Sequence, residues 1–243
     1  PISMSLDEKE YREFPLVEKV ELTHNTRKFR FALPSPDSEL GLPIGMHVWV
    51  LAKDADGKEH RRSYTPTSLY DAKGHFDLVI KLYPTGIFSQ YIEKFAIGDK
   101  LKVCGPKGRF KYSPGMKRAF GMLAGGSGIT PCFQIMKEIL RHPEDKTQLS
   151  LLYGNLTVDD ILLRDELDEM DSKDNCEVYH VLNNPPEDWK QGSGFITPEM
   201  ISTHFPAPAE DVLICLCGPP PMIKAMKGHL DALGYTKDML FTF

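Results

Sequence analysis

Four short stretches of the sequence combine residue types that could bind a phosphorylated, partly aromatic ligand. The first is Arg62-Ser63-Tyr64-Thr65, which we place at the end of an early strand. Because side chains alternate along a strand, Arg62 and Tyr64 face the same side, where a guanidinium can fork onto a phosphate and a phenol ring can pack beside a flat ligand. The Thr65 hydroxyl or backbone N–H would then reach a ring heteroatom. The alternative is a basic turn that ends in a proline-kinked strand.

The second stretch is Gly86-Ile87-Phe88-Ser89, which follows an expected strand at 76–83 and opens a short helix at 88–95. Glycine lets the backbone approach a ligand closely, and the start of a helix offers unpaired N–H groups and, here, a serine hydroxyl to an anion. A pyrophosphate would suit this arrangement. The alternative is a glycine loop with a serine N-cap, which needs no ligand.

The third stretch is Gly125-Gly126-Ser127-Gly128-Ile129-Thr130-Pro131, between an apolar strand and a helix. Its glycines leave the backbone free to approach a dinucleotide, and the helix N-terminus supplies positive potential. Thr130 and Pro131 are typical of a helix cap and first turn. The stretch is not a Walker loop, because no Gly-Lys-Ser/Thr follows, and it lacks the G-x-G-x-x-G spacing. A tight strand-to-helix turn is the alternative interpretation.

The fourth stretch is Cys217-Gly218-Pro219-Pro220-Pro221-Met222, at the end of the last strongly apolar strand. A thiol held there by a Gly-Pro turn would lie at the same carboxyl edge of a parallel sheet as Thr130, where the reacting ring of a dinucleotide is expected. A lone buried cysteine is more commonly a small apolar core residue.

The elements that must position these residues form two groups. The part at 10–112 reads as short strands, strongest at 47–52 and 76–83, and predicts an antiparallel β-barrel. Residues 113–118 form the expected linker. The part at 119–243 alternates strands and helices, which predicts a doubly wound α/β domain with a mostly parallel sheet. Its expected strands are 119–124, 148–153, 177–182 and 212–217, and its expected helices are 131–141, 159–170, 198–204 and 219–233.

The composition excludes several classes of protein. A hydrophobic fraction of 41% and a charged fraction of 26% are those of an ordinary globular protein. The net charge of -5 argues against nucleic-acid binding, which requires a basic surface. No apolar run is long enough to span a membrane. The five cysteines lack metal-ligand spacing, so we expect no metal site and a reducing compartment.

Together the four stretches, in this order and over nearly the whole chain, resemble the ferredoxin-reductase-like flavoproteins, and within them the NADH-cytochrome b5 reductases and the reductase domains of nitrate reductases. The resemblance implies FAD as cofactor and NADH as substrate, with the arginine on the FAD pyrophosphate and Thr65 and Cys217 as catalytic residues. The FAD contacts that it implies are Arg62, Ser63, Tyr64, Thr65, Val79, Ile80, Lys81, Tyr83, Gly86, Ile87, Phe88, Ser89 and Thr130. Animal relatives carry Lys-Met where this chain has Ile87-Phe88, so a lysine contact is lost there.

The NADH contacts implied by the resemblance are Gly125, Gly126, Ser127, Gly128, Thr130, Pro131, Asn183, Cys217, Gly218, Pro219, Pro220, Met222 and Phe243. Asn183 stands where animal relatives have an aspartate for the adenosine ribose. Hydride would pass from NADH to the flavin, and electrons would pass singly to cytochrome b5 or a b5-like haem protein. A reductase module of a nitrate reductase and a non-enzymatic flavin-binding regulatory module are the alternatives. We expect a cytoplasmic monomer, soluble as given, whose full-length form in this family can carry a membrane anchor before Pro1.

Overall fold

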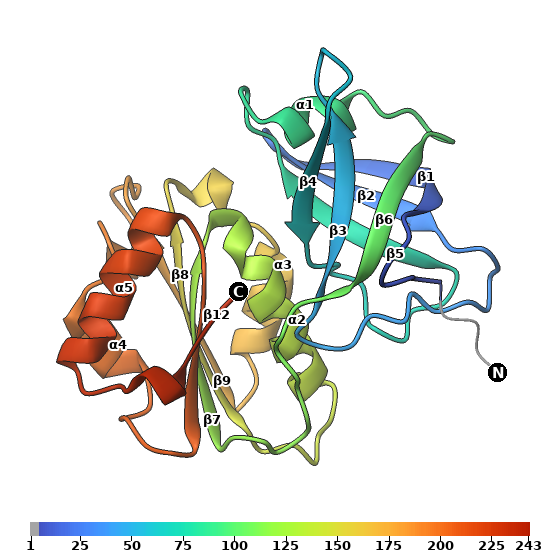
Figure 1. The fold of residues 1–243 in the computed structure, drawn as a ribbon. Coiled ribbons are helices and arrows are strands. Elements are labelled where there is room, and N and C mark those ends of the chain that lie inside the picture. Colours follow the sequence, from blue (N-terminus) through green and yellow to red (C-terminus); the bar gives the residue numbers. More distant parts are fainter. Residues whose placement is uncertain (1–4) are drawn as a thin grey trace. The chain divides into compact units, whose positions relative to one another are not determined.

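The computed structural model describes residues 5–243, and in it the chain divides after Tyr112 into two units. Each unit has its own sheet (Figure 1). Each also has its own hydrophobic core. Both classes of fold predicted from the sequence are confirmed: an antiparallel sheet in the first unit and a parallel sheet covered by helices in the second.

The first unit is a six-stranded antiparallel sheet in the order β4-β3-β6-β1-β2-β5. The two ends of this ladder are linked where the chain leaves β4, because the Thr67 N–H donates to the Asp77 carbonyl on β5 at 3.0 Å. The elements are β1 (Arg12–Thr23), β2 (Thr26–Ala32), β3 (His47–Lys53), β4 (Glu59–Tyr64), β5 (His75–Lys81), α1 (Ile87–Glu93) and β6 (Lys100–Lys107).

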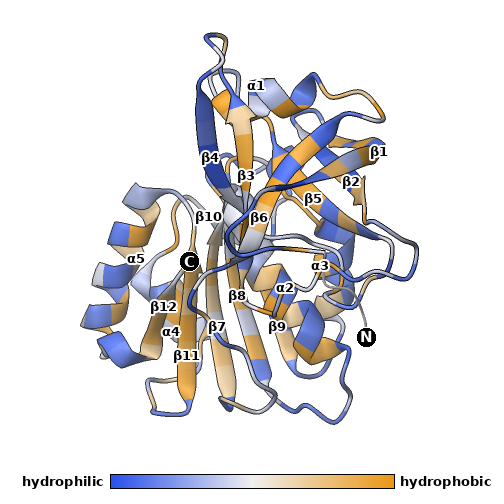
Figure 2. Ribbon diagram, turned by 45° about the vertical axis from the view of Figure 1, so that its right-hand side comes forward, coloured by the Kyte–Doolittle hydropathy of each residue, from blue (hydrophilic) through white to orange (hydrophobic). Residues whose placement is uncertain are grey.

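The core of this unit follows from strict alternation along its strands. On β5, Phe76, Leu78 and Ile80 are fully buried in the core, while Asp77 and Val79 lie on the opposite face. On β3, Val48 and Val50 face the core in the same way. Each such side chain contributes about 1.5–3 kcal/mol relative to exposure. Figure 2 shows the contrast between apolar β3 and its hydrophilic neighbour β4.

The second unit is a six-stranded sheet in the order β10-β9-β8-β7-β11-β12, with parallel pairing throughout. Its central strands are continuous apolar runs because helices cover both faces, α2 and α3 on one side and α4 and α5 on the other (Figures 1 and 2). The elements are β7 (Ala119–Gly125), α2 (Ile129–Leu140), β8 (Gln148–Asn155), α3 (Arg164–Asp171), β9 (Cys176–Leu182), β10 (Gly192–Ser193), α4 (Pro198–His204), β11 (Val212–Cys217), α5 (Pro220–Ala232) and β12 (Leu240–Thr242).

The helix predicted at 159–170 is wrong over its first half. A 3-10 turn, η2 (Val158–Asp160), comes first, and α3 begins only at Arg164. Thr157 and Asp160 cap this turn reciprocally, and Leu163 then adopts a left-handed conformation with φ 57°. A non-glycine residue in that conformation cannot continue a helix. The short strands β10 and β12 were not predicted because two or three residues carry no periodic signal.

Within residues 5–243, no helix has the length and apolarity needed to cross a membrane.

Candidate functional site

The end of β4 presents the first predicted stretch as the alternation requires. Arg62 pairs with Val50 and Tyr64 with Val48 across the β3–β4 ladder, so both side chains belong to the same face. Arg62 is exposed, and its guanidinium donates to the neighbouring Arg61 carbonyl at 2.8 Å. The Tyr64 ring lies 4.8 Å from the Phe88 ring of α1, and burial raises the pKa of its hydroxyl. A fixed aromatic side chain therefore stands two residues from a permanent cation.

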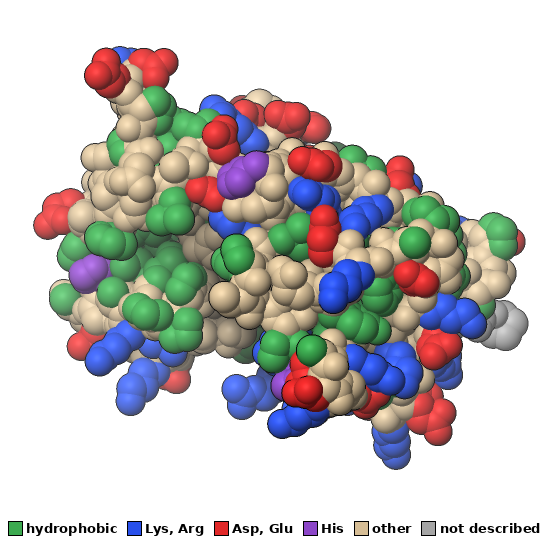
Figure 3. Space-filling model, turned by 90° about the horizontal axis from the view of Figure 1, so that it is seen from above, with side chains coloured by type: hydrophobic (Ala, Val, Ile, Leu, Met, Phe, Trp, Pro, Cys, Tyr) green, Lys and Arg blue, Asp and Glu red, His purple; other side chains and the backbone are tan. Residues whose placement is uncertain are grey.

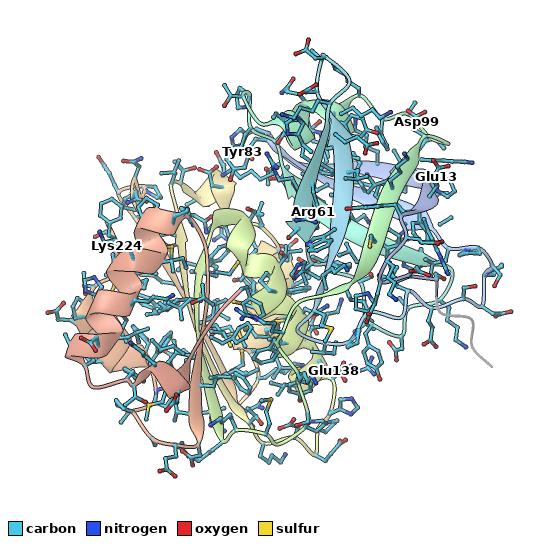
Figure 4. The ribbon with its side chains drawn as sticks, viewed as in Figure 1. Glu13, Arg61, Tyr83, Asp99, Glu138 and Lys224 are labelled. Atoms are coloured by element: carbon cyan, nitrogen blue, oxygen red, sulfur yellow. The ribbon has the colours of Figure 1, made fainter. Side chains whose placement is uncertain are left out.

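The neighbouring strand β5 divides its predicted contacts between two faces. Val79 and Lys81 lie on the face opposite the core, whereas Ile80 is fully buried in the core. Ile80 can therefore reach a ligand only through its backbone. Tyr83, just past the strand, is 48% exposed (Figure 4, which also labels Arg61).

The loop before α1 differs from the expectation at one side chain. The Ser89 hydroxyl accepts from the Tyr83 N–H at 3.0 Å and donates to the Lys81 carbonyl at 3.4 Å, so it is turned inward. Phe88 is buried in the core, and no side chain caps the helix at Gly86. A phosphate at this loop would therefore meet backbone N–H groups, while the serine hydroxyl holds the end of β5 in place.

The glycine-rich loop at the end of β7 contains glycines of two kinds. A Cβ at Gly128 would overlap the Cys217 carbonyl, and one at Gly125 would lie 2.5 Å from the Met222 sulfur. These two glycines are required because the loop packs directly on the turn after β11. Gly126 is different, since its φ is +52° and no atom lies within 4 Å of its Cβ position. It is the glycine that faces open space.

The helix that follows begins in a way that orders the same loop. Residues Gly126–Gly128 form a 3-10 turn, η1, and the Thr130 hydroxyl donates back to the Ser127 carbonyl at 3.3 Å. The helix α2 begins at Ile129, two residues earlier than predicted, so Pro131 lies in its first turn and Thr130 lies inside the helix and does not cap it. The free backbone donors of this helix start therefore point toward the carboxyl edge of the sheet.

The turn after β11 brings the fourth stretch to the same edge. Pro219 precedes the first helical residue of α5, Pro220, and the Met222 side chain packs against Gly218 and Gly125. Burial raises the pKa of the Cys217 thiol to about 11, so the group is a neutral thiol at physiological pH. The C-terminal Phe243 lies alongside, because its N–H donates to the Leu216 carbonyl at 3.0 Å.

The loop after β9 carries Asn183, whose N–H donates to the Asn155 carbonyl at 3.0 Å. Two apolar side chains that the sequence reading missed flank it at this edge. Leu156 follows β8 and is 56% exposed, and Phe195 follows β10 and is 80% exposed. The sequence did carry a signal for Phe195, because an aromatic residue that follows Gly192 and Gly194 indicates a loop with an exposed ring. Figure 3 shows hydrophobic side chains gathered on the face of the molecule seen from above.

The structure thus brings the third and fourth stretches, Asn183 and Phe243 to the carboxyl edge of one sheet, and brings the first two stretches together around Tyr64 and Phe88. The first set offers backbone N–H donors beside a neutral thiol. The second offers an exposed guanidinium beside packed aromatic rings. Within residues 5–243, no group of three or more His, Cys, Asp or Glu side chains could hold a metal ion.

Comparison with known proteins agrees with this division. The oxidoreductase FAD-binding domain model matches residues 13–112, and the oxidoreductase NAD-binding domain model matches residues 122–228. NADH-cytochrome b5 reductase 1 of Dictyostelium discoideum is 50% identical over 243 residues, which cover 100% of this chain and 85% of the relative. The protein of the same name from Arabidopsis thaliana is 52% identical over 98% of this chain and 85% of its own length.

A solved structure shares the fold of both units. The cytochrome b5 reductase domain of Ulva prolifera nitrate reductase has a TM-score of 0.94 and 36% identity, over 99% of this chain and 100% of that domain. With about half of all positions identical over 85% of the length of these relatives, the chain belongs to the NADH-cytochrome b5 reductase family.

Proposed function

We propose that this chain takes hydride from NADH onto a bound FAD and passes electrons singly to cytochrome b5 or a b5-like haem protein. The observation that carries the proposal is the direct packing of the glycine-rich loop on the Cys217 turn, at Gly125 and Gly128. That packing places backbone donors for a dinucleotide next to a neutral thiol at the carboxyl edge of a parallel sheet. The names and high identity of the relatives support the same activity.

In the first unit, the residues present fit FAD. Arg62 offers an exposed bidentate donor for the pyrophosphate, and Tyr64 and Thr65 are held beside it for the flavin ring. Val79 and Lys81 lie on the outward face of β5, with Ile80 and Tyr83 beside them in the chain. Within the stretch Gly86 to Ser89, the N–H groups of Ile87 to Ser89 would face the phosphate, because the Gly86 N–H bonds to the Tyr83 carbonyl. We assign Ser63, and Thr130 of the second unit, to the same ligand. When bound, FAD supplies the exchange between two-electron and one-electron transfer.

In the second unit, each part of NADH has a candidate partner. Gly126 and the N–H groups of the following turn would hold the pyrophosphate. The Asn183 amide would form hydrogen bonds with the adenosine ribose hydroxyls. The exposed side chains of Leu156 and Phe195 would offer apolar surface to the adenine. Cys217 would pack against the nicotinamide as a neutral thiol. We assign Ser127, Pro131, Gly218, Pro219, Pro220, Met222 and Phe243 to the surrounding wall.

A reductase module of a nitrate reductase is the second candidate. The observation that favours it is the likeness to the Ulva prolifera domain, whose full length this chain matches. The two candidates share the same hydride transfer and differ in what is fused to the chain and in the haem protein that accepts electrons.

For the remaining properties, we propose a monomer located in the cytoplasm, with an FAD-binding domain at 10–112, a linker at 113–118 and an NADH-binding domain at 119–243. The support for the boundaries is the division of the structure after Tyr112 and the start of β7 at Ala119. We propose no role in nucleic-acid binding, given the net charge of -5.

An anaerobic NADH titration followed by visible spectroscopy tests the proposed function. We expect a purified yellow protein whose flavin absorbance bleaches with one equivalent of NADH and recovers when ferric cytochrome b5 is added. Flavin that stays oxidised under NADH would refute the hydride transfer. Bleaching without reduction of cytochrome b5, but with reduction of a nitrate reductase haem domain, would favour the second candidate.

A further inference from the structure

Tyr153 is a buried side chain that none of the four motifs contains. It lies on β8, one strand away from the glycine-rich loop, and its ring is 0% exposed. Its hydroxyl donates to the Gly126 carbonyl at 2.9 Å and accepts from the Leu162 N–H at 3.3 Å. A single oxygen atom therefore joins the glycine-rich loop to the segment that precedes α3.

The bond to Gly126 has a consequence for the next peptide N–H. In a trans peptide, the carbonyl and the following N–H point in opposite directions. Because Tyr153 holds the Gly126 carbonyl toward the buried side of the loop, the Ser127 N–H in the same peptide unit is directed away from it. Gly126 has no side chain to fix this peptide, so its orientation depends on the hydrogen bonds to its carbonyl, which come from the Tyr153 hydroxyl and the Ile129 N–H.

The bond to Leu162 keeps the hydroxyl in place. Leu162 is buried, and the following Leu163 has the left-handed φ of 57° that interrupts the expected helix. The 3-10 turn before it ends at Ile161, whose backbone is extended, so the Leu162 N–H bonds to Tyr153 and not to a helical carbonyl. The irregular start of α3 thus serves to aim the tyrosine hydroxyl at the loop.

The geometry points to Tyr153 as a positioning residue that orients the backbone donors of the glycine-rich loop toward the pyrophosphate of the nucleotide. This inference rests on the proposed function. Without the hydroxyl, only the Ile129 N–H would hold the Gly126 carbonyl, and the peptide would populate other orientations. The measured affinity would then fall in proportion to the fraction of molecules in the competent orientation. The chemistry at the nicotinamide would be unchanged, because the Tyr153 hydroxyl bonds to Gly126 and Leu162 and to no residue that we assign to the nicotinamide.

The test is Tyr153→Phe in the full-length holoprotein, which removes one oxygen atom and keeps the ring. We expect ADP-ribose binding, measured by calorimetry, to weaken by about 3- to 10-fold, the range expected for one hydrogen bond. The KM for NADH should rise by a similar factor, while kcat at saturating NADH stays within about twofold of the parent value.

Tyr235→Phe is the matched control. Tyr235 is also buried in the second unit, and its hydroxyl donates to the Pro206 carbonyl at 2.6 Å, far along the chain from the loop. We expect this variant to lose thermal stability but to keep the parent affinity for ADP-ribose. An unchanged affinity in Tyr153→Phe, or an equal loss in both variants, would overturn the inference. If the parent chain bound no ADP-ribose, the proposed function would be contradicted first, and the inference with it.

Discussion

Arg62 and Arg61 are neighbours on β4 whose side chains have different environments. The Arg61 guanidinium lies over the Trp49 ring at 3.7 Å, while Arg62 belongs to the opposite face and is exposed. If Arg62 holds the FAD pyrophosphate, Arg62→Ala should weaken FAD binding by roughly 10- to 100-fold, the loss expected when hydrogen bonds to a charged group are removed. The ratio of flavin to protein after gel filtration measures this loss.

Arg61→Ala is the control for that prediction, because it removes the same charge from the adjacent position. It should retain the flavin content of the parent and lose contacts away from the FAD site, with Trp49 and Tyr11. Full flavin occupancy in Arg62→Ala would remove the arginine from the FAD site.

Asn183 allows a prediction about nucleotide choice. An amide can bond to the ribose hydroxyls of NADH but does not repel the extra phosphate of NADPH as a carboxylate does, and no arginine stands in the same turn to attract it. We therefore expect a clear but incomplete preference for NADH. Asn183→Asp should raise the NADH to NADPH ratio of kcat/KM on the order of tenfold, because like charges near a surface repel by up to roughly 4 kcal/mol at close range.

Steady-state kinetics with both nucleotides check this preference. Asn183→Ala, which removes the amide without adding charge, separates repulsion from lost hydrogen bonding and should lower kcat/KM for NADH. A parent protein that prefers NADPH, or an unchanged ratio in Asn183→Asp, would show that the ribose pocket lies elsewhere.

For single residues, the sequence predicted correctly which segments meet at the sheet edge, but it did not predict the role of each residue there. The three loop glycines were interpreted as room for a ligand, yet Gly125 and Gly128 are explained by packing on Met222 and Cys217. A sequence cannot reveal that, because the contact joins segments about ninety residues apart in the chain. Ser89 was expected to offer its hydroxyl to an anion, but local bonds to Lys81 and Tyr83 use it. Tyr153 was missed because it reads as an ordinary core strand residue.

At the scale of elements, β9 carries a buried histidine beneath α3. His180 is 3% exposed, neither ring nitrogen has a hydrogen-bond partner among the described residues, and burial lowers its pKa from the ordinary value of 6.5. The unfolded chain therefore binds a proton more readily than the folded one below that pH. Stability linked to His180 is complete above pH 6.5 and is lost as the pH falls through and below it.

We therefore expect the thermal midpoint of the parent to fall more steeply between pH 7.5 and 5.5 than that of His180→Phe, with about 2–4 °C for each 1 kcal/mol. Differential scanning fluorimetry at matched ionic strength measures both curves. His204→Phe serves as control, because that imidazole is paired with Glu177 at 2.6 Å. Parallel pH profiles in the parent and His180→Phe would show that His180 does not couple to folding.

The helices and strands were predicted correctly where their spacing of apolar residues is regular and their ends carry local signals. The helix at 198–204 agrees with α4 because Thr197 caps it and Pro198 opens it, which are signals local to the sequence. The helix at 159–170 failed because the competing signal, a reciprocal cap between Thr157 and Asp160, closes only a single turn. Helical spacing of apolar residues could not distinguish a broken helix from a continuous one.

At the scale of the whole molecule, the strongest signal in the sequence was the change near residue 113 from short alternating strands to apolar strands separated by helices. Alternating strands give one sheet buried on its inner face, and apolar strands separated by helices give a sheet buried on both. These patterns depend on burial alone, so they predicted both folds without knowledge of any ligand. The exposed Phe195 and Leu156 were not predictable in this way, because their positions follow from the parallel order of β8, β9 and β10.

The two units also differ in their cores, and this leads to a prediction about autonomy. One core cluster is built only from residues between Leu6 and Val103, and another only from residues between Ala119 and Tyr235. A domain with its own core and roughly 100–150 residues can fold alone.

We therefore expect the fragment 113–243 to unfold cooperatively and to bind ADP-ribose within about threefold of the full chain, because every residue assigned to the pyrophosphate and ribose lies within it. The same fragment should retain no FAD, since Arg62 and Tyr64 are absent. Circular dichroism melting and calorimetry test both points, with the full chain as the reference. A fragment that is unfolded at 25 °C, or that is folded but binds no ADP-ribose, would show that the nucleotide site depends on residues before Ser113.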